Sequence, residues 1–451
     1  MVNNITLKNG VRVVYEQVTS LRSCSLGIWV ESGSRHEPEE LSGISHFIEH
    51  MMFKGTDKMN AAQLAEAFDA IGGGVNAFTT KENTCYYVKT LDEYLDKGAE
   101  VLCHMYFDSV FTKENTDLER GVIVEEIGMY EDTPEDVANE LLAMNMYGTC
   151  SLGRPILGTR ESLAGIDENI LMDYYKKNYT PKNTIVSLAG SFSEESLQKI
   201  IARFENMPEG NPPVMPEAVY TPVFVNKERD IEQNHIYIAF PALAQGDDRR
   251  FTAAVLNNIL GGGMSSRLFQ TVREQNGLCY TVYSFVSSSV GTGVLGIYTA
   301  TNKNTEHKAV QLICDECRKI CEKGVTPEEL DRSKSQLKAA ALMSLENTAT
   351  RMTNNAKNHM VYGREITPEE IAAGYEAVTL EGVKELANLI FDFDKMSLTA
   401  VIKIRQGIII YPFGHCSFDA VNHQGFVTLG FQNADNGSII LQQHRQQSPN
   451  L

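Results

Sequence analysis

The sequence predicts an α+β protein of two homologous domains, each with an antiparallel-rich sheet packed by helices. Three observations support this fold class. At 451 residues the chain is too long for one ordinary hydrophobic core. A proline-rich stretch at 208–222, PEGNPPVMPEAVYTP, has neither helical nor strand periodicity and divides the chain into similar halves. Both halves show the same order of elements, so we expect domains at 1–207 and 223–402 joined by a linker at 208–222.

The elements of each half follow from periodicity, since alternating apolar residues predict strands and apolar residues three or four apart predict helices. The first half is expected to contain strands at 11–17 and 25–32, a helix around His46, a helix ending in glycines at 61–74, and strands at 75–80 and 84–90. The second half is expected to contain a strand at 235–240, a helix ending in glycines at 251–263, strands at 278–285 and 293–300, helices from Thr305, and a last strand at 396–404.

The last 49 residues, 403–451, differ in composition from the rest of the chain. They hold five charged side chains and no glutamate, whereas the chain has 40 basic and 58 acidic residues in total. Such a change indicates an appended tail, or a reading frame that departs from its ancestor near residue 403, and we assign it no fold. A small β-hairpin with an Asn-Gly turn is the alternative.

Composition limits the partners. The formal charge of −18 disfavours nucleic acid and anionic membrane surfaces and favours basic peptides, although an acidic surface that only maintains solubility explains it as well. The apolar runs are far shorter than a membrane span. Nine scattered cysteines form no disulfide framework, and the first residues show no export signal, so we expect a cytoplasmic protein.

The stretch HFIEH places His46, Glu49 and His50 within one helical turn. Positions i and i+4 project from the same face of a helix, so His46 and His50 can bind one ion. A catalytic zinc site needs three protein ligands and an open position for water, and Glu49 can act as general base toward that water. The order H-x-x-E-H is the inverzincin motif. A partly buried, histidine-rich helix is the alternative until a third ligand is found.

Carboxylates on a later segment, the predicted helix at 117–142, are candidates for that third ligand. Glu119 and Glu126 lie on one stripe with apolar residues, which allows one ligand and one carboxylate that orients a histidine. Glu125 lies on a different stripe. Periodicity alone does not choose between Glu125 and Glu126.

The chain resembles the pitrilysin-type metallopeptidases, in the short-chain branch that includes mitochondrial processing peptidase and its bacterial relatives. Four segments carry the resemblance, in the family's order: HFIEHMMFKGT, GGGVNAFTTKENTCYY, ERGVIVEEIGMYEDTPED and SSRLFQTVREQNGLCYTVYS. The resemblance implies that Glu126, 76 residues beyond His50, is the third zinc ligand, and that Glu119 orients a ligand. It also implies one Zn²⁺ per chain.

The same resemblance gives roles to residues outside the motif. Arg273 and Tyr280 match a pair that binds substrate from another domain, where a phenol can donate to the carbonyl oxygen as it becomes negative. The segment NAFTT matches an edge strand that pairs with extended substrate. The candidate peptide contacts on this strand are Asn76, Ala77, Phe78 and Thr79.

The resemblance thus implies a zinc metalloendopeptidase that cleaves unfolded segments or short peptides, with Glu49 as base. Long-chain relatives close four such domains around a chamber, so a homodimer of this two-domain chain is expected, with Arg273 and Tyr280 acting in cis or in trans. The alternative is a catalytically inactive scaffold or substrate-binding subunit of the same family.

Two further patterns are interpreted as structural. Residues 291–296, GTGVLG, fit the dinucleotide pattern G-x-G-x-x-G, but they are followed by a strand rather than a helix, so no nucleotide cofactor is expected. Cys314, Cys317 and Cys321 share one helical face. A buried stripe of small apolar residues explains them better than a second metal.

Overall fold

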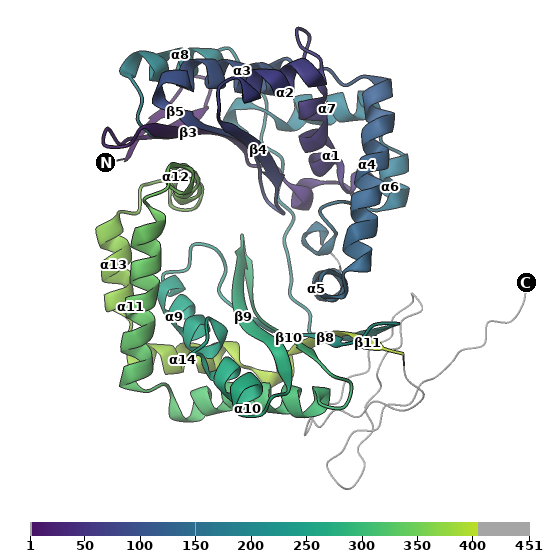
Figure 1. Ribbon diagram of the computed structural model, residues 1–451, viewed down its shortest axis with the longest axis vertical. Helices are drawn as coiled ribbons and strands as arrows, with labels where there is room; N and C mark the ends of the chain where they lie inside the picture. Colours follow the sequence, from purple (N-terminus) through teal and green to yellow (C-terminus); the bar gives the residue numbers. More distant parts are fainter. Residues whose placement is uncertain (1, 149, 405–451) are drawn as a thin grey trace, which may run out of the picture. The chain divides into compact units, whose positions relative to one another are not determined.

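The computed structural model of the protein describes residues 2–148 and 150–404 (Figure 1). The chain folds into two compact units. Among the described residues, the first unit comprises 2–129, 150–217 and 339–371, and the second comprises 130–148, 218–338 and 372–404. Apart from Lys403 and Ile404, the predicted tail at 403–451 lies outside the described residues.

The first unit is built on a six-stranded sheet in the order β1-β2-β6-β3-β5-β4. Its strands are β1 (Val2–Thr6), β2 (Arg12–Gln17), β3 (Ser23–Val30), β4 (Gly74–Thr79), β5 (Thr84–Leu91) and β6 (Thr184–Gly190). The β2–β6 pair is parallel, and the other pairs are antiparallel. Because β4 ends this order, it is an edge strand.

Helices cover the sheet of the first unit on one face around a large apolar cluster, which includes Leu26, Ile28 and Phe47. These helices are α1 (Ile44–Met51), α2 (Ala61–Asp69), α3 (Leu95–Phe107), α4 (Lys113–Asp132), α6 (Arg160–Ala164), α7 (Glu168–Asn178) and α8 (Glu194–Phe204). α12 (Thr348–Tyr362) packs on β2, β3 and β6, where a separate cluster contains Trp29 and Met352 (Figure 1).

The second unit repeats the topology of the first with a five-stranded sheet in the order β7-β11-β8-β10-β9. Its strands are β7 (Phe224–Arg229), β8 (Asn234–Pro241), β9 (Cys279–Ser289), β10 (Thr292–Thr301) and β11 (Ser397–Lys403). Its one parallel pair, β7–β11, corresponds to β2–β6. The expected duplication of one α+β arrangement is therefore confirmed.

Helices of the second unit surround its own apolar cluster, which includes Ile238, Leu256 and Ile313. They are α9 (Arg250–Gly261), a π-helical turn at Phe269–Glu274, α10 (Glu306–Lys323), α11 (Pro327–Ser344), α13 (Pro368–Glu376) and α14 (Leu380–Ile390). α11 and α13 each span a boundary between the units. Cys314 and Cys317 are buried in this cluster, and Cys321 is half-buried against it.

Each half of the chain contributes one helix to the unit of the other half. α5 (Pro134–Met146) packs on β7, β8 and β11, whereas α12 packs on the sheet of the first unit. The sequence predicts continuous domains at 1–207 and 223–402. The units of the structure differ from these ranges because α5 belongs to the second unit and α12 to the first. Between 205 and 223 there is no helix or strand.

The single helix predicted at 117–142 was wrong, because the structure has two helices there. α4 ends at Asp132 and α5 begins at Pro134, with Thr133 in an extended conformation at φ −98° and ψ 104°. A residue before proline is disfavoured in helical geometry, so the chain turns at this point. The break lets α4 and α5 belong to different units.

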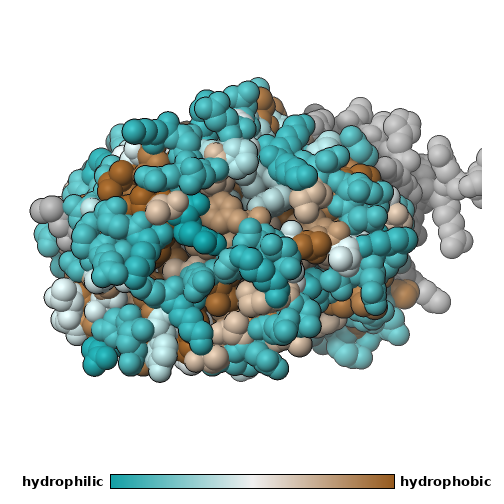
Figure 2. Space-filling view, turned by 90° about the horizontal axis from the view of Figure 1, so that it is seen from above, coloured by the Kyte–Doolittle hydropathy of each residue, from teal (hydrophilic) through white to brown (hydrophobic). Residues whose placement is uncertain are grey.

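The space-filling view shows a mainly hydrophilic face with small, separate hydrophobic groups (Figure 2). Among the described residues, no helix combines the length and apolar character needed to cross a membrane.

Candidate metal centre

The start of α1 is fixed by a buried carboxylate from outside the helix. Gly43 precedes the helix at φ 94°, and a Cβ there would lie 2.6 Å from the carbonyl oxygen of Leu157. Glycine therefore fits this position, but it offers no side-chain cap. Glu37 supplies the acceptor instead, with Oε2 2.7 Å from Gly43 N and Oε1 2.8 Å from Ser45 N.

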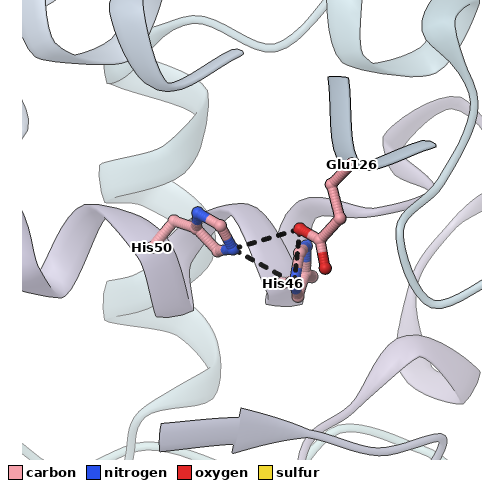
Figure 3. Close-up of side chains that lie close together, drawn as sticks. All are labelled: His46, His50 and Glu126. Atoms are coloured by element: carbon pink, nitrogen blue, oxygen red, sulfur yellow. Dashed lines mark hydrogen bonds and ion pairs between the residues drawn. The ribbon is translucent and has the colours of Figure 1, made fainter. Parts of the chain in front are cut away.

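Three side chains from α1 and α4 converge on one point. His46 and His50 lie one turn apart on α1, and Glu126 reaches them from α4 (Figure 3). The two Nε2 atoms are 3.2 Å apart, and Glu126 Oε2 lies 3.7 Å from His46 Nε2 and 3.6 Å from His50 Nε2. Among the described residues this is the one group of three or more His, Cys, Asp or Glu side chains with metal-site spacing.

These separations fit a tetrahedral zinc ion. Zinc bonds of about 2.0–2.2 Å place neighbouring ligand atoms roughly 3.3 Å apart. Two imidazoles and one carboxylate are a donor set of catalytic zinc sites, in which the fourth position holds water or substrate. His46, His50 and Glu126 would therefore hold the ion and leave one position open.

His50 is oriented by a carboxylate that is itself held by a lysine. Glu119 Oε1 lies 2.8 Å from His50 Nδ1, and Lys54 pairs with the other Glu119 oxygen. Burial raises the pKa of Glu119, but the hydrogen bonds from His50 and Lys54 outweigh it and lower the pKa overall. An ionised Glu119 accepts the Nδ1 proton, so the His50 Nε2 lone pair is presented to the metal position.

His46 is the most buried of the three, with 8% of its surface exposed. Burial, with a further contribution from His50, lowers its pKa to about 3. The imidazole is therefore neutral at physiological pH, which is the form that binds metal.

Glu49 lies beside this group without being one of its three members. Its Oε2 accepts a hydrogen bond from the Thr79 hydroxyl at the end of β4. Burial raises the pKa of Glu49, Glu126 adds to this effect, and the Thr79 hydrogen bond and His50 oppose it. A raised carboxyl pKa suits a group that must accept a proton and release it again near neutral pH.

The structure chooses between the two glutamates that periodicity left open. Glu126 joins His46 and His50, whereas Glu125 is exposed on the stripe that also exposes Leu118 and Met129.

The four candidate peptide contacts on β4 do not share one environment. Ala77 packs on the α1 side of the sheet, whereas Phe78 packs on the opposite side, 5.4 Å from the Trp29 ring. The Asn76 side chain accepts the Ala77 N–H at 2.9 Å, and Thr79 bonds to Glu49. A peptide could thus pair with the backbone of the edge strand β4 more readily than it could contact the side chain of Phe78.

Arg273 and Tyr280 lie together in the second unit. The Arg273 guanidinium is 4.9 Å from the centre of the Tyr280 ring and 4.5 Å from that of Phe269. Arg273 belongs to the π-helical turn, and Tyr280 lies in β9 with 77% of its surface exposed. The predicted pair is thus assembled, with its phenol open to solvent.

Sequence reasoning missed Glu37, Lys54 and the bond from Thr79 to Glu49. Lys54 lies four residues beyond His50, within the quoted segment HFIEHMMFKGT, so its position was a usable signal. Glu37 and Thr79 reach the site through tertiary contacts, and no spacing indicates them.

Fold and site together define a two-unit chain of the metallopeptidase type, with one candidate metal centre among its described residues. The chain belongs to peptidase family M16. The model described as Insulinase (Peptidase family M16) matches residues 12–160, and the model described as Peptidase M16 inactive domain matches residues 165–337.

Relatives in several bacteria are similar along most of their length. YmxG of Bacillus subtilis, named an uncharacterized zinc protease, is 42% identical over 395 residues, which cover 87% of this chain and 97% of the relative. SCO5738 of Streptomyces coelicolor, with the same description, is 37% identical and covers 86% of each chain.

Solved structures with low identity show the same fold. A peptidase M16 inactive domain from Pseudomonas fluorescens superposes with a TM-score of 0.83 at 20% identity, covering 89% of this chain and 98% of its own. A protease from Helicobacter pylori gives the same score and identity and covers 89% and 99%.

Proposed function

We propose that the protein is a zinc-dependent endopeptidase with one ion per chain, held by His46, His50 and Glu126. The observation that carries this proposal is the convergence of His46 Nε2, His50 Nε2 and Glu126 Oε2 at 3.2–3.7 Å, with Glu49 beside them. The zinc protease names of the bacterial relatives support it.

We also propose that the protein acts in a reducing compartment such as the cytoplasm. The eight described cysteines are free, which supports this location.

Glu49 is the proposed general base and acid. A zinc ion, when bound, supplies a Lewis acid that polarises a peptide carbonyl and lowers the pKa of water. Glu49 takes a proton from the attacking water and gives it to the leaving amine. The raised pKa of Glu49 supports both transfers, because the carboxyl then holds the proton firmly enough to keep it until the leaving amine accepts it.

The proposed substrates are unfolded segments or short peptides, with basic peptides favoured by the charge of −18. The edge strand β4 offers backbone groups to an extended peptide, which gives affinity for many sequences. Tyr280 would donate to the carbonyl oxygen as it gains negative charge, with Arg273 holding the peptide near it. We propose that the working form is a homodimer.

Replacing Glu49 with Gln tests the base directly. Gln keeps the size of Glu49 but cannot accept the proton, so cleavage of a basic peptide should fall by about 10²–10⁴-fold. Zinc content, measured by mass spectrometry, should stay equal to that of the wild type. Full activity in Glu49→Gln would contradict the assignment. Wild-type protein that binds no zinc and cleaves nothing would favour the scaffold or substrate-binding role.

Mixing variants tests the proposed dimer. Glu49→Gln chains and Tyr280→Phe chains are each expected to be impaired. If Tyr280 acts in trans, mixed dimers should regain one working site, and if it acts in cis, mixing should restore nothing. Size-exclusion chromatography with light scattering gives the oligomeric state independently, and a monomer that is fully active would contradict the dimer.

A further inference from the structure

Thr79 connects the edge strand β4 to the carboxylate of Glu49. Its hydroxyl donates to Glu49 Oε2, although Thr79 belongs to a different element from α1. Side chains along a strand alternate between the two faces of a sheet. Thr79 therefore shares its face with Ala77, which packs toward α1, while Phe78 packs against Trp29 on the other face.

The turn that follows β4 holds the Thr79 backbone in place. Thr80 N and Oγ1 both donate to the Asn83 carbonyl, at 2.8 and 2.9 Å, and Asn83 N donates back to Thr80 Oγ1 at 3.0 Å. The Thr80 carbonyl also accepts the Ser34 N–H at 3.1 Å. Gly33 lies so close that a Cβ there would clash with this carbonyl. These contacts hold the backbone directly after Thr79, and so support the position of its hydroxyl.

A glutamate side chain has three rotatable bonds, so a base of this kind is effective only when neighbouring groups hold it. With Oε2 bonded to Thr79, the remaining oxygen, Oε1, is the one left for proton transfer. We propose that Thr79 is a positioning residue for Glu49. This inference rests on the proposed function. It differs from the expectation that Thr79 contacts the peptide, because its hydroxyl is committed to Glu49.

One consequence follows from the position of Thr79 at the end of β4. If an extended peptide pairs with this strand, the strand that binds substrate also holds the base. Loss of the hydroxyl should then lower kcat and leave substrate affinity nearly unchanged, because the backbone groups of β4 remain.

The test compares Thr79→Val with Thr79→Ser in the full-length protein. Valine keeps the branched shape and removes the hydroxyl, whereas serine keeps the hydroxyl. We expect kcat for a basic fluorogenic peptide to fall about 10–100-fold in Thr79→Val, with KM within about threefold of wild type and zinc content unchanged. Thr79→Ser should retain most of the wild-type kcat. Thr79→Ala serves as a second hydroxyl-free variant if Thr79→Val does not fold.

Thr84→Val is the matched control. Thr84 lies opposite Thr79 in the β4–β5 register, and its hydroxyl donates to the Ser32 carbonyl at 2.9 Å rather than to Glu49. This variant should lower the melting temperature and leave kcat near the wild-type value.

Four outcomes would overturn the proposal: a wild-type kcat in the hydroxyl-free variants, a raised KM with unchanged kcat, loss of zinc, or no rescue by serine. The proposed function fails separately, if the wild type itself neither binds zinc nor cleaves peptide.

Discussion

The two units share a sheet topology but differ at one corresponding pair of helices. In the first unit, α1 follows β3 and meets α4 through His50, which lies 2.8 Å from Glu119 and 3.6 Å from Glu126. In the second unit, α9 follows β8 and meets α11 through Asn258. The Asn258 amide donates to Ser333 Oγ at 3.0 Å and to Gln336 Oε1 at 3.1 Å.

This difference separates a site that fits an ion from one that needs none. An amide and a hydroxyl each donate and accept, so Asn258 and its partners satisfy one another. In the first unit, the Glu126 carboxylate can only accept hydrogen bonds. It faces Nε2 of His50, which carries no proton because the proton of this imidazole lies on Nδ1, bonded to Glu119. Such lone pairs in close contact are stabilised by a cation. The contact through Asn258 in the second unit thus uses an amide and a hydroxyl where the first unit uses imidazole and carboxylate groups.

The exchanged helices both combine apolar and polar contacts. α12 packs Met352 between Trp29 and Gly27. It also bonds to the first sheet, since the Asn355 amide donates to Glu16 at 3.1 Å and the hydroxyls of Thr348 and Ser25 lie 2.9 Å apart. α5 meets the second sheet partly through polar groups, since the Tyr283 hydroxyl donates to Glu135 at 2.8 Å. The two exchanged helices are thus alike in using polar contacts to their sheets, and the difference between the units lies at the α1–α4 contact.

The largest effect is expected at the start of α1, where the buried Glu37 accepts two backbone N–H groups, whereas Asp247 before α9 is only half-buried. Burial raises the pKa of Glu37 to about 7, from an ordinary value of 4.5. A carboxyl with a raised folded-state pKa stabilises the fold at low pH and loses this contribution as pH rises from about 4.5 to about 7. Between these pH values, the free energy of unfolding of the zinc-free wild type should fall by about 3 kcal/mol relative to that of Glu37→Gln. Calorimetry at a series of pH values measures this difference.

Asp247, just before α9, provides the matched control. Hydrogen bonds from Arg249 lower its pKa, so its contribution is lost as pH falls rather than as it rises. Asp247→Asn should therefore change the pH dependence of the unfolding free energy only weakly, and in the direction opposite to the change in Glu37→Gln. If the unfolding free energy of Glu37→Gln depends on pH as that of the wild type does, Glu37 does not stabilise the start of α1 in this way, and the proposed difference from the start of α9 is contradicted.

A smaller effect is expected when the partner of His50 loses its charge. Glu119→Gln removes the ion pair with Lys54 and weakens the hold on the His50 Nδ1 proton. Zinc affinity should fall about 10–100-fold, measured by competition with a chromophoric chelator. Glu125→Gln, on the exposed face of the same helix, should bind zinc as the wild type does. Equal affinity in both variants would show that Glu119 does not support the site.

Much of the fold was predictable because alternation at 11–17 and 235–240 and the glycine-ended helices repeat in both halves. The pairing of His46 and His50 was predictable because they lie one turn apart, whereas periodicity left Glu125 and Glu126 open and the family resemblance indicated Glu126. The exchange of α5 and α12 was not predictable from periodicity, which shows that a face is apolar but not which sheet covers it. The bond from Thr79 to Glu49 and the role of Glu37 were missed for the same reason, as the partners lie on elements distant in the sequence.

The most direct test exchanges the corresponding residues of the two helix pairs and counts zinc per chain by mass spectrometry. The wild type and Asn258→His should each bind about one ion, because α11 offers Ser333 and Gln336 where α4 offers carboxylates. His50→Asn should bind none and cleave no peptide. Full zinc content in His50→Asn, or a second ion in Asn258→His, would contradict the assignment of the metal centre to the first unit alone.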